Sequence, residues 1–331
     1  MPVSVIELFA GAGGLALGLE RAGLENTALI EVNKDAVATL RYNRPKWNVI
    51  QTDICSYSFK GLKADVVTGG FPCQAFSYAG KGNGLEDKRG ALFYEFARCV
   101  REVKPKLFLA ENVAGLISHG KGQTLKTILS TLQSLGYKVQ YRLLDALNYD
   151  VPQKRKRVII VGTRTGINFE YPAPQSSVLT LKDALVDVPP SEGLKYGPAK
   201  LEVMKLVPPG GYWRDLPEEI RKNYAVKSYC RRGGCTGMAR RMSWDQPSLT
   251  ITTSPSQKRT ERCHPEETRP FTVREYARIQ TFPDEWQFIG GTASKYRQIG
   301  NAVAVNFAYH LGKSIIRAFD TDTFNFSISN Y

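Results

Sequence analysis

The residue whose chemistry stands out first is Cys73, in the segment Gly69-Gly-Phe-Pro-Cys-Gln-Ala-Phe-Ser77. The apolar run before it, residues 64–68, predicts a buried strand, and the two glycines and Pro72 end that strand in a tight turn. We therefore expect Cys73 on a loop at the carboxyl end of a strand, where open α/β sheets bind their ligands. A thiolate there can act as a nucleophile. The alternative is a small apolar core residue, the commonest role of a free cysteine.

A second feature is a glycine-rich turn near the start of the chain. Residues 4–9 predict a strand, Ala10-Gly-Ala-Gly-Gly14 a turn, and the apolar residues that follow a helix ending at Gly23. Glycines let a ligand approach the backbone, and a helix N-terminus favours negative charge. The spacing differs from G-x-G-x-x-G, so the turn alone is a weak signal.

Glu31 and Asp53 are acidic residues that could complete a nucleotide site. Glu31 ends the next predicted strand, about twenty residues after Gly11, where a carboxylate can bind both hydroxyls of a ribose. That fits an adenosine cofactor without a 2′-phosphate. Glu31 could equally be a solvent-facing strand end, and Asp53 could bind an adenine amino group or be a turn residue.

Two more polar segments lie beside predicted strands. Glu111-Asn-Val113 ends the strand that begins at Lys106, and Gln153-Lys-Arg-Lys-Arg157 lies between strands expected at 137–144 and 157–161. The basic segment could contact phosphates or bases, or it could be a solvated turn. Residues 80–90, polar and glycine-rich, predict a loop of the kind that often covers an active site.

The composition indicates a basic protein whose cysteines are reduced. Lys and Arg number 45 against 31 Asp and Glu in 331 residues, a net charge of +14. This surplus favours nucleic acid as a partner, although a generally basic protein would also show it. We find no transmembrane-length apolar run and no signal-peptide start, and the six scattered cysteines suggest reduced thiols in a cytoplasm.

The pattern of alternating strands and helices stops near residue 165. Prolines become frequent there, and basic residues occur among aromatic ones, a mixture that can hold a nucleic-acid backbone and touch bases. A zinc site could be considered for Cys230, Cys235, Cys263 and His264, but the spacing is poor, so no metal is predicted.

Periodic patterns predict the helices. They cover residues 34–43, 92–103 and 124–135, and a capping-box sequence, Thr272-Val-Arg-Glu275, opens another that should end before Pro283. A long amphipathic helix is expected from about residue 301 to 318, followed by a frayed tail.

Taken in order, these segments resemble the C5-cytosine DNA methyltransferases of bacterial restriction-modification type, over nearly the whole chain. The matching motifs are Phe9-Ala-Gly-Ala-Gly-Gly14, Gly70-Phe-Pro-Cys-Gln74, Glu111-Asn-Val113, Gln153-Lys-Arg-Lys-Arg157, Arg274-Glu275 with Arg278, Gln280 and Phe282-Pro283, and Gly300-Asn-Ala-Val303. Their order makes the combination highly specific.

The resemblance implies an α/β, Rossmann-like S-adenosylmethionine-dependent methyltransferase fold with a smaller inserted target-recognition domain. We expect residues 1–164 to form the catalytic, cofactor-binding domain and residues 165–271 the target-recognition domain. Residues 272–331 should form a hinge and a C-terminal helix that returns to pack beside the first strand, so that Asn301 reaches the cofactor.

The resemblance also implies a mechanism. The Cys73 thiolate adds to C6 of a cytosine flipped out of the duplex, so that C5 can attack a methyl group. Glu111 donates a proton to N3 and accepts a hydrogen bond from the exocyclic amine. Arg155 and Arg157 stabilise the ring oxygen and a nearby phosphate.

The site residues that the resemblance implies fall into two sets. S-adenosyl-L-methionine, which leaves as S-adenosyl-L-homocysteine, is expected to contact Phe9, Ala10, Gly11, Gly13, Gly14, Glu31, Val32, Asp53, Ile54, Pro72, Leu92, Asn301 and Val303. DNA contacts are expected from Gln74, Ser77, Lys81, Arg89, Arg231, Arg232, Arg240, Arg241, Thr250, Gln257, Lys258 and Arg259. Thr250-Ile251 matches the pair that marks the core of the family's recognition region, and most of the basic residues are expected to contact phosphates.

The implied partner is double-stranded DNA, and no membrane is involved. We expect a cytoplasmic bacterial monomer, associated with the nucleoid through DNA, that protects host DNA from a cognate restriction endonuclease. Which bases it recognises does not follow from the sequence.

Three other classes of protein explain less of the sequence. A nicotinamide dehydrogenase would share the glycine turn but needs neither the thiol nor the basic insert. A cysteine hydrolase would need a histidine in a catalytic motif, and His119, His264 and His310 lie in none. A non-catalytic DNA-binding protein would not explain the cofactor turn.

Overall fold

The apolar runs of the first half of the chain form one sheet. The structure, a computed structural model, describes residues 2–72, 91–224 and 236–328. These divide into two compact units: a first unit of residues 1–149, 156–174 and 303–331, and a second unit of residues 150–155 and 175–302. Cys73 and the rest of its loop lie outside the described residues.

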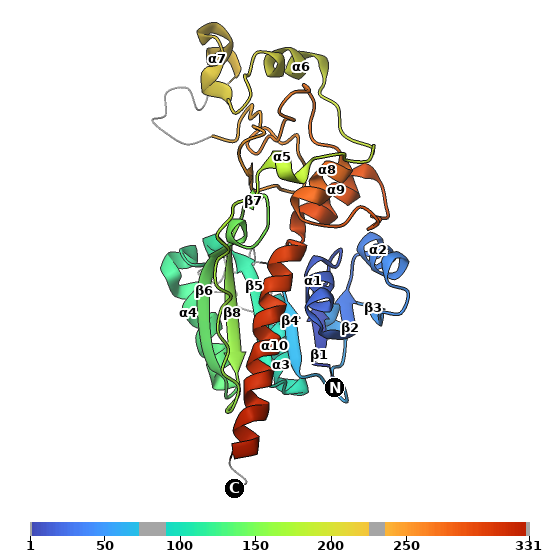
Figure 1. Cartoon of the computed structure of the whole chain (residues 1–331), viewed down its shortest axis with the longest axis vertical. Helices are drawn as coiled ribbons and strands as arrows, with labels where there is room; N and C mark the ends of the chain where they lie inside the picture. The colour runs from blue at the N-terminus through green and yellow to red at the C-terminus, as the bar shows by residue number, and fades with distance from the viewer. Residues whose placement is uncertain (1, 73–90, 225–235, 329–331) are drawn as a thin grey trace. The chain divides into compact units, whose positions relative to one another are not determined.

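The sheet belongs to the first unit, and its described strands are ordered β3-β2-β1-β4-β5-β8-β6 (Figure 1). The first five are parallel, and β8 runs antiparallel to both β5 and β6. This confirms a mostly parallel α/β sheet. The strands are β1 (Ser4–Leu8), β2 (Glu25–Glu31), β3 (Val49–Gln51), β4 (Val66–Gly69), β5 (Leu107–Val113), β6 (Lys138–Asp145) and β8 (Lys156–Thr163).

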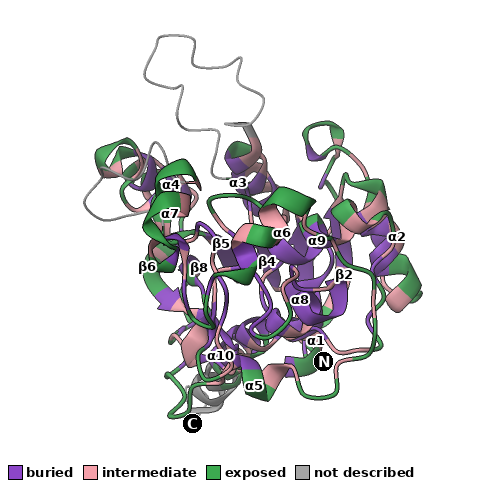
Figure 2. Ribbon diagram, turned by 90° about the horizontal axis from the view of Figure 1, so that it is seen from above, coloured by how far each residue is buried: buried purple, intermediate pink, exposed green. Residues whose placement is uncertain are grey.

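Helices cover both faces of this sheet. The described helices of the first unit are α1 (Gly14–Ala22), α2 (Lys34–Asn43), α3 (Ala91–Val103), α4 (Gln123–Ser134) and α10 (Val305–Ile328), with short 3-10 turns at Ile54–Ser56, Ala114–Leu116, His119–Gly122 and Ala146–Asn148. On one face, α3 and α4 bury Phe96 and Ile128 against central strands such as β5, whose Phe108 is fully enclosed. The central strands are accordingly buried in Figure 2.

On the other face, α10 returns from the far end of the sequence and packs on α1. A Cβ at Gly18 would overlap Ala308, and one at Gly312 would lie 2.6 Å from the Cβ of Ala22, so the two helices approach closely only because both residues are glycine. The expected return of the closing helix is therefore present, although its packing partner is α1. The helix continues to Ile328, where we expected a frayed tail. No helix in the described ranges is long and apolar enough to cross a bilayer.

The second unit has little regular secondary structure. Its described elements are β7 (Gln153–Lys154), β9 (Ser248–Leu249), α5 (Leu181–Ala184), α6 (Pro198–Lys205), a 3-10 turn at Trp213–Asp215, α7 (Glu218–Tyr224), α8 (Val273–Ile279) and α9 (Thr292–Asn301). The predicted capping box opens α8: Thr272 Oγ1 accepts from Glu275 N, and the Glu275 carboxylate accepts from Thr272 N. A small apolar core around Trp213 and Met204 supports α6.

The unit boundaries differ from those expected from the sequence. The change comes after residue 174 and not after 164, because Phe169 and Tyr171 still contact β6 and β8. Residues 272–302, expected to be a hinge, belong to the second unit, and so does the short segment 150–155. The chain therefore passes between the units four times.

Candidate active site

The glycine turn after β1 holds the Glu31 carboxylate in a fixed position. Phe9, Gly11 and Gly13 all adopt positive φ angles, of 57°, 53° and 84°. This turn directs Gly11 N to Glu31 Oε2 at 2.8 Å, and Asn33 N donates to Glu31 Oε1, also at 2.8 Å. Both oxygens keep lone pairs free to accept from further donors, as a ribose diol would require.

Other predicted cofactor residues of the first unit follow the carboxyl ends of β1, β2, β3 and β4. Asp53 is exposed, and its Oδ1 accepts from Cys55 N at 2.9 Å, while Ile54 beside it is buried. Val32 is 64% exposed, so it has an apolar surface available to a ligand. Among the remaining residues, Ala10 and Gly14 are buried, Leu92 and Val303 are half-buried, and Pro72 is exposed.

Glu7, which we did not single out in the sequence, is buried in β1 just before this turn. It is 2% exposed, and its strand partner in β4 is Thr68. Burial and, to a lesser degree, the negative charge of Glu31 raise the pKa of Glu7 well above its ordinary value. Burial therefore favours the neutral form of Glu7 in the folded chain. In the sequence, the signal for this buried residue was an acidic side chain within an otherwise apolar strand.

Glu111 and Arg157 form the central ion pair of the site. Glu111 lies on β5 and Arg157 on the adjacent β8, with Arg157 Nε 2.6 Å from Glu111 Oε1. Both side chains are largely shielded, at 13% and 11% exposure, so the pair is little screened by solvent. A Cβ at Gly70 would lie 3.1 Å from Glu111 Oε2, which explains a glycine in that position.

A hydrogen bond links this acid segment to the start of the cysteine loop. Asn112 Nδ2 donates to Phe71 O at 2.9 Å, and Phe71 is buried against Phe93 and Phe96. The backbone two residues before Cys73 is therefore fixed next to Glu111. A carboxyl group from β5 and a guanidinium from the adjacent β8 thus lie beside the backbone of Gly70 and Phe71 that follows β4.

Comparison with known proteins agrees with this geometry. A family profile for C-5 cytosine-specific DNA methylases matches residues 3–317. The chain belongs to this family. It is a DNA cytosine-5-methyltransferase.

Relatives of this methyltransferase cover almost its whole length. Type II methyltransferase M.Eco47II of Escherichia coli is 57% identical over 96% of this chain and 79% of its own. Type II methyltransferase M.Sau96I of Staphylococcus aureus is 54% identical over 95% of this chain and 75% of its own. Among solved structures, the methyltransferase EhMeth of Entamoeba histolytica shares the fold, with a TM-score of 0.70, 18% identity, and coverage of 96% of this chain and 99% of the other.

Arg155, which we expected to stabilise the substrate beside Arg157, lies in the second unit of the methyltransferase. Its side chain is 3% exposed. The guanidinium donates to three backbone carbonyls of that unit, Ile251 O at 3.1 Å, Gly300 O at 2.9 Å and Ala302 O at 3.1 Å. These contacts indicate a structural task for Arg155 that the Q-x-R-x-R pattern alone did not reveal.

Arg241, one of the predicted DNA contacts, also has a structural role. It is 4% exposed, and its guanidinium donates to Val207 O, Met204 O, His264 O and Thr268 Oγ1, among other acceptors. Because all of its nitrogens are bonded within the unit, the expectation that Arg241 contacts DNA is wrong. The positive charge in the sequence did not show that carbonyls would surround it.

The other predicted DNA contacts differ in exposure. Gln257, Lys258 and Arg259 are exposed on the second unit, so they are available to a ligand. Arg240 is half-buried over the Tyr212 ring, and burial lowers its pKa. Thr250 donates to Lys154 O at 2.6 Å. Gln74, Ser77, Lys81, Arg89, Arg231 and Arg232 lie outside the described residues.

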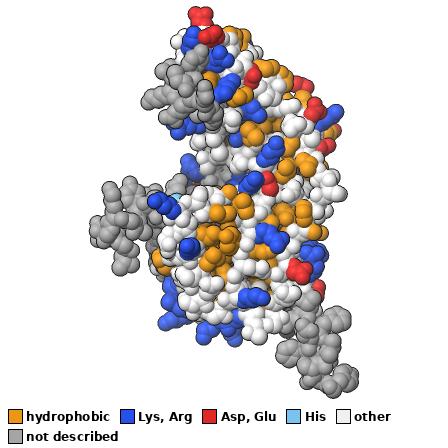
Figure 3. Space-filling view, turned by 90° about the vertical axis from the view of Figure 1, so that its left-hand side faces the viewer, with side chains coloured by type: hydrophobic (Ala, Val, Ile, Leu, Met, Phe, Trp, Pro, Cys, Tyr) orange, Lys and Arg blue, Asp and Glu red, His pale blue; other side chains and the backbone are white. Residues whose placement is uncertain are grey.

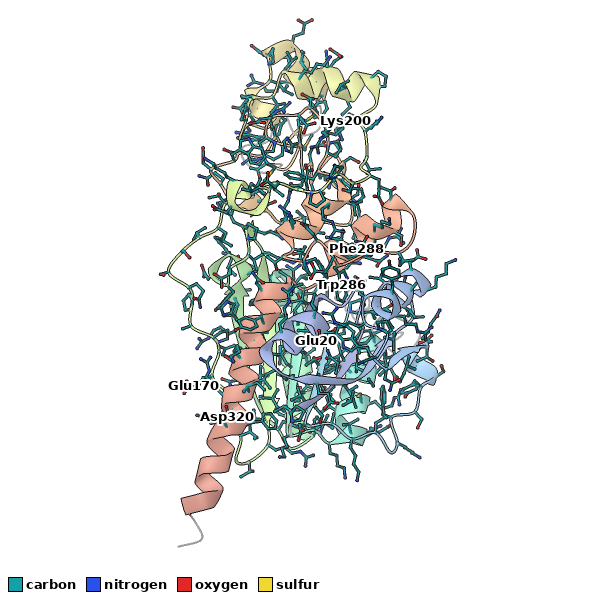
Figure 4. The ribbon with its side chains drawn as sticks, turned by 45° about the vertical axis from the view of Figure 1, so that its right-hand side comes forward. Glu20, Glu170, Lys200, Trp286, Phe288 and Asp320 are labelled. Atoms are coloured by element: carbon teal, nitrogen blue, oxygen red, sulfur yellow. The ribbon has the colours of Figure 1, made fainter. Side chains whose placement is uncertain are left out.

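Lysines and arginines are spread over the face of the methyltransferase shown in Figure 3. Inside the second unit, charges are paired. Glu261 is fully buried and lies 2.8 Å from the Nζ of Lys200, whose position on α6 is marked in Figure 4. Burial raises the pKa of Glu261 and lowers that of Arg262 to about 10. These interior charges were not identified from the sequence.

The residues considered for zinc do not form a site in the described part of the chain. No group of three possible metal ligands occurs there. Cys263 and His264 are buried, and the His264 ring packs edge-on against Trp244 and Phe271 at 5.1 and 5.9 Å. Cys230 and Cys235 lie outside the described residues.

Proposed function

We propose that this methyltransferase methylates C5 of a cytosine in a specific short double-stranded DNA sequence, through a covalent adduct between Cys73 and C6 of a flipped base. The observation that carries the proposal is the Glu111–Arg157 pair, which lies next to the backbone of Gly70 and Phe71 that leads into Cys73. A carboxyl group and a guanidinium at this point match what a cytosine ring needs when a thiolate adds to it.

The chemistry follows from the ring. Cytosine C5 is a weak nucleophile, and addition of a thiolate at C6 moves electron density onto C5. S-adenosylmethionine, when bound, supplies the electrophilic methyl group. Loss of the C5 proton and departure of the Cys73 thiolate then restore the aromatic ring. Because the duplex hides C6 within the base stack, the base has to leave the stack.

Glu111 and Arg157 have different proposed roles at the cytosine ring. Without DNA, the Arg157 guanidinium lies 2.6 Å from the Glu111 carboxyl group and holds it in position. We propose that the entering base takes Arg157 as a donor to its O2 atom, which frees Glu111 to share a proton with N3. The ion pair thus keeps both groups in place until the substrate replaces one half of it.

The residues around the glycine turn fit S-adenosylmethionine. Glu31 has fixed oxygens for a ribose diol, and the exposed Asp53 carboxylate can accept from an adenine amine. Val32 offers exposed apolar surface beside them. Asn301 belongs to the second unit, and its approach to the cofactor remains part of the proposal.

The biological setting is proposed from the relatives, whose names describe Type II methyltransferases. By analogy, we propose that the protein protects host DNA from a cognate restriction endonuclease, and that it acts as a monomer in the bacterial cytoplasm, associated with the nucleoid through DNA. The exposed Gln257, Lys258 and Arg259 are the described candidates for DNA contact.

Two measurements test the proposal. Bisulfite sequencing of genomic DNA treated with the purified protein and S-adenosylmethionine should show one methylated context. DNA carrying 5-fluorocytosine in that context should form an adduct that survives denaturation, because the fluorine blocks the final loss from C5. Random methylation would contradict sequence specificity, and the absence of an adduct would contradict the covalent mechanism.

A further inference from the structure

A short stretch of backbone leads from the recognition region to the catalytic arginine. β7 (Gln153–Lys154) pairs in parallel with β9 (Ser248–Leu249), directly before Thr250. The Thr250 hydroxyl extends this pairing by donating to Lys154 O at 2.6 Å. Arg157 follows three residues after Lys154. The segment that carries the recognition pair Thr250-Ile251 is therefore hydrogen-bonded to the segment that ends in Arg157.

Gln153 fixes the first half of this connection. Its side chain is fully buried. Gln153 Oε1 accepts from Ile251 N at 3.0 Å, and Gln153 Nε2 donates to Gln280 Oε1 at 2.9 Å. The side-chain amide of Gln153 is thus hydrogen-bonded both to the recognition pair and to Gln280 at the end of α8.

Arg155 and Gln280 fix the second half. Arg155 donates to Ile251 O on one side and to Gly300 O and Ala302 O on the other. Gln280, also fully buried, donates to Ala302 O at 2.8 Å and to Ile299 O at 2.9 Å. Three buried polar side chains therefore join four segments that are far apart in the sequence.

The positions of these bonds along the chain are informative. Arg155 and Ala302 are the last residues of the second unit before the chain enters β8 and α10 of the first unit. The hydrogen bond from Arg155 to Ala302 O therefore joins two of the four points at which the chain passes from one unit to the other. If Ile251 moves, Arg155 has to move with it or lose its buried hydrogen bond to Ile251 O. Losing that bond would cost free energy, because the buried carbonyl would have no donor.

We propose that Arg155 is a positioning residue that couples base recognition to catalysis. Its bonds to Ile251 and Ala302 make the backbone around residue 155 follow the recognition pair, and Arg157, two residues later, positions Glu111. Contact with the correct DNA sequence then sets the geometry of the acid–arginine pair. The inference rests on the proposed roles of Glu111 and Arg157.

The decisive variant is Arg155→Lys, which keeps the charge but cannot bond three separate carbonyls with a planar fork. Its matched control is Arg241→Lys. Arg241 is equally buried and is also bonded to carbonyls of the same unit, but its hydrogen bonds go to residues 204, 207, 264 and 266–268 and not to segment 150–155 or to the residues around Ile251. Turnover is measured on the site identified for the wild type and on the same DNA with one base of that site changed.

If Arg155 couples recognition to catalysis, Arg155→Lys lowers kcat on the correct site by about 10- to 100-fold, the size of effect expected from a displacement of roughly 1 Å. It lowers turnover on the altered site much less, so the preference between the two DNAs falls. KM for S-adenosylmethionine stays unchanged. Arg241→Lys, which only weakens the fold, lowers turnover on both DNAs by the same factor and keeps the preference.

An unchanged preference in Arg155→Lys, or an equal fall in Arg241→Lys, would overturn the proposal. Should Arg155→Lys fail to fold, Gln153→Leu decides, because Gln153 has no assigned contact with DNA or cofactor; the change removes its bonds to Ile251 N and Gln280 and is expected to lower the preference in the same direction. Failure of the proposed function is a separate result, since the wild-type protein would then methylate no DNA.

Discussion

The two units of this protein hold themselves together in different ways. In the first unit, the backbone pairs with itself along β1, β4, β5 and β8, and apolar side chains such as Phe108 fill the space beneath the helices. In the second unit, strand pairing amounts to two residues in β7 and two in β9 among those described. Backbone carbonyls there are satisfied instead by the buried guanidinium groups of Arg155, Arg241 and Arg262.

Because of this difference, charged residues have different roles in the two units. In the first unit, the sheet satisfies the backbone, and we propose that Glu111 and Arg157 at the strand ends serve the chemistry. In the second unit, where the described strand pairing is short, Arg155 and Arg241 bond backbone carbonyls instead. Substitutions in the first unit's site should therefore affect turnover, and substitutions of buried arginines in the second unit should affect stability.

The largest effect is expected at Cys73. Cys73→Ala should abolish methyl transfer, because no other group can add to C6, and should leave DNA binding largely intact, because phosphate contacts supply most of the affinity. Methyl incorporation and DNA binding by the same preparation measure the two properties. Retained turnover would remove Cys73 from the mechanism.

Glu111→Gln should have the next largest effect. Glutamine keeps the shape but cannot carry a proton to N3, so the rate should fall by about 10²- to 10⁴-fold, more than DNA binding weakens. Single-turnover methylation and DNA binding of the variant are to be compared with those of the wild type, and the melting temperature checks that the variant is folded. A glutamine variant with wild-type turnover would show that Glu111 transfers no proton.

Arg241→Met should destabilise the second unit by roughly 3 kcal/mol or more, because several buried carbonyls lose their donor. Denaturant unfolding measures the free energy. The control is Arg21→Met, an exposed arginine on α1 of the first unit, for which a change within about 0.5 kcal/mol is expected. Equal effects of the two substitutions would contradict the contrast between the units.

The smallest effect concerns pH and Glu7. Its folded pKa is raised above the ordinary value of 4.5, so Glu7 stabilises the fold at acidic pH, and this contribution is lost as the pH rises from about 4.5 towards the raised pKa. Glu7→Gln has no proton to lose. Its stability relative to the wild type should therefore increase between pH 5 and pH 8, by up to about 1.4 kcal/mol per pH unit.

Melting temperatures of Glu7→Gln and the wild type across this pH range check that expectation. Glu25→Gln, an exposed glutamate at the start of β2, is the control and should show no such trend. If the difference between Glu7→Gln and the wild type were constant with pH, Glu7 would not be neutral in the fold.

The sequence by itself determined most elements of the first unit and the family to which the chain belongs. Alternating strands and helices, the glycine turn and Thr272-Glu275 are local patterns, and local backbone preferences fix what they form. The spacing from Gly11 to Glu31 was enough to place a carboxylate at the cofactor turn, because parallel strands end at one edge.

Only the tertiary structure decided which charges serve chemistry and which serve the fold. Arg155 and Arg157 are two residues apart in one motif, yet one bonds Gly300 O, 145 positions away, and the other bonds Glu111. The physical reason is that a sequence shows the charge of a guanidinium but not the acceptors around it. For Arg155, those acceptors are backbone carbonyls, which every residue has, so they cannot be recognised from residue types in the sequence. Only folding brings them together around the guanidinium.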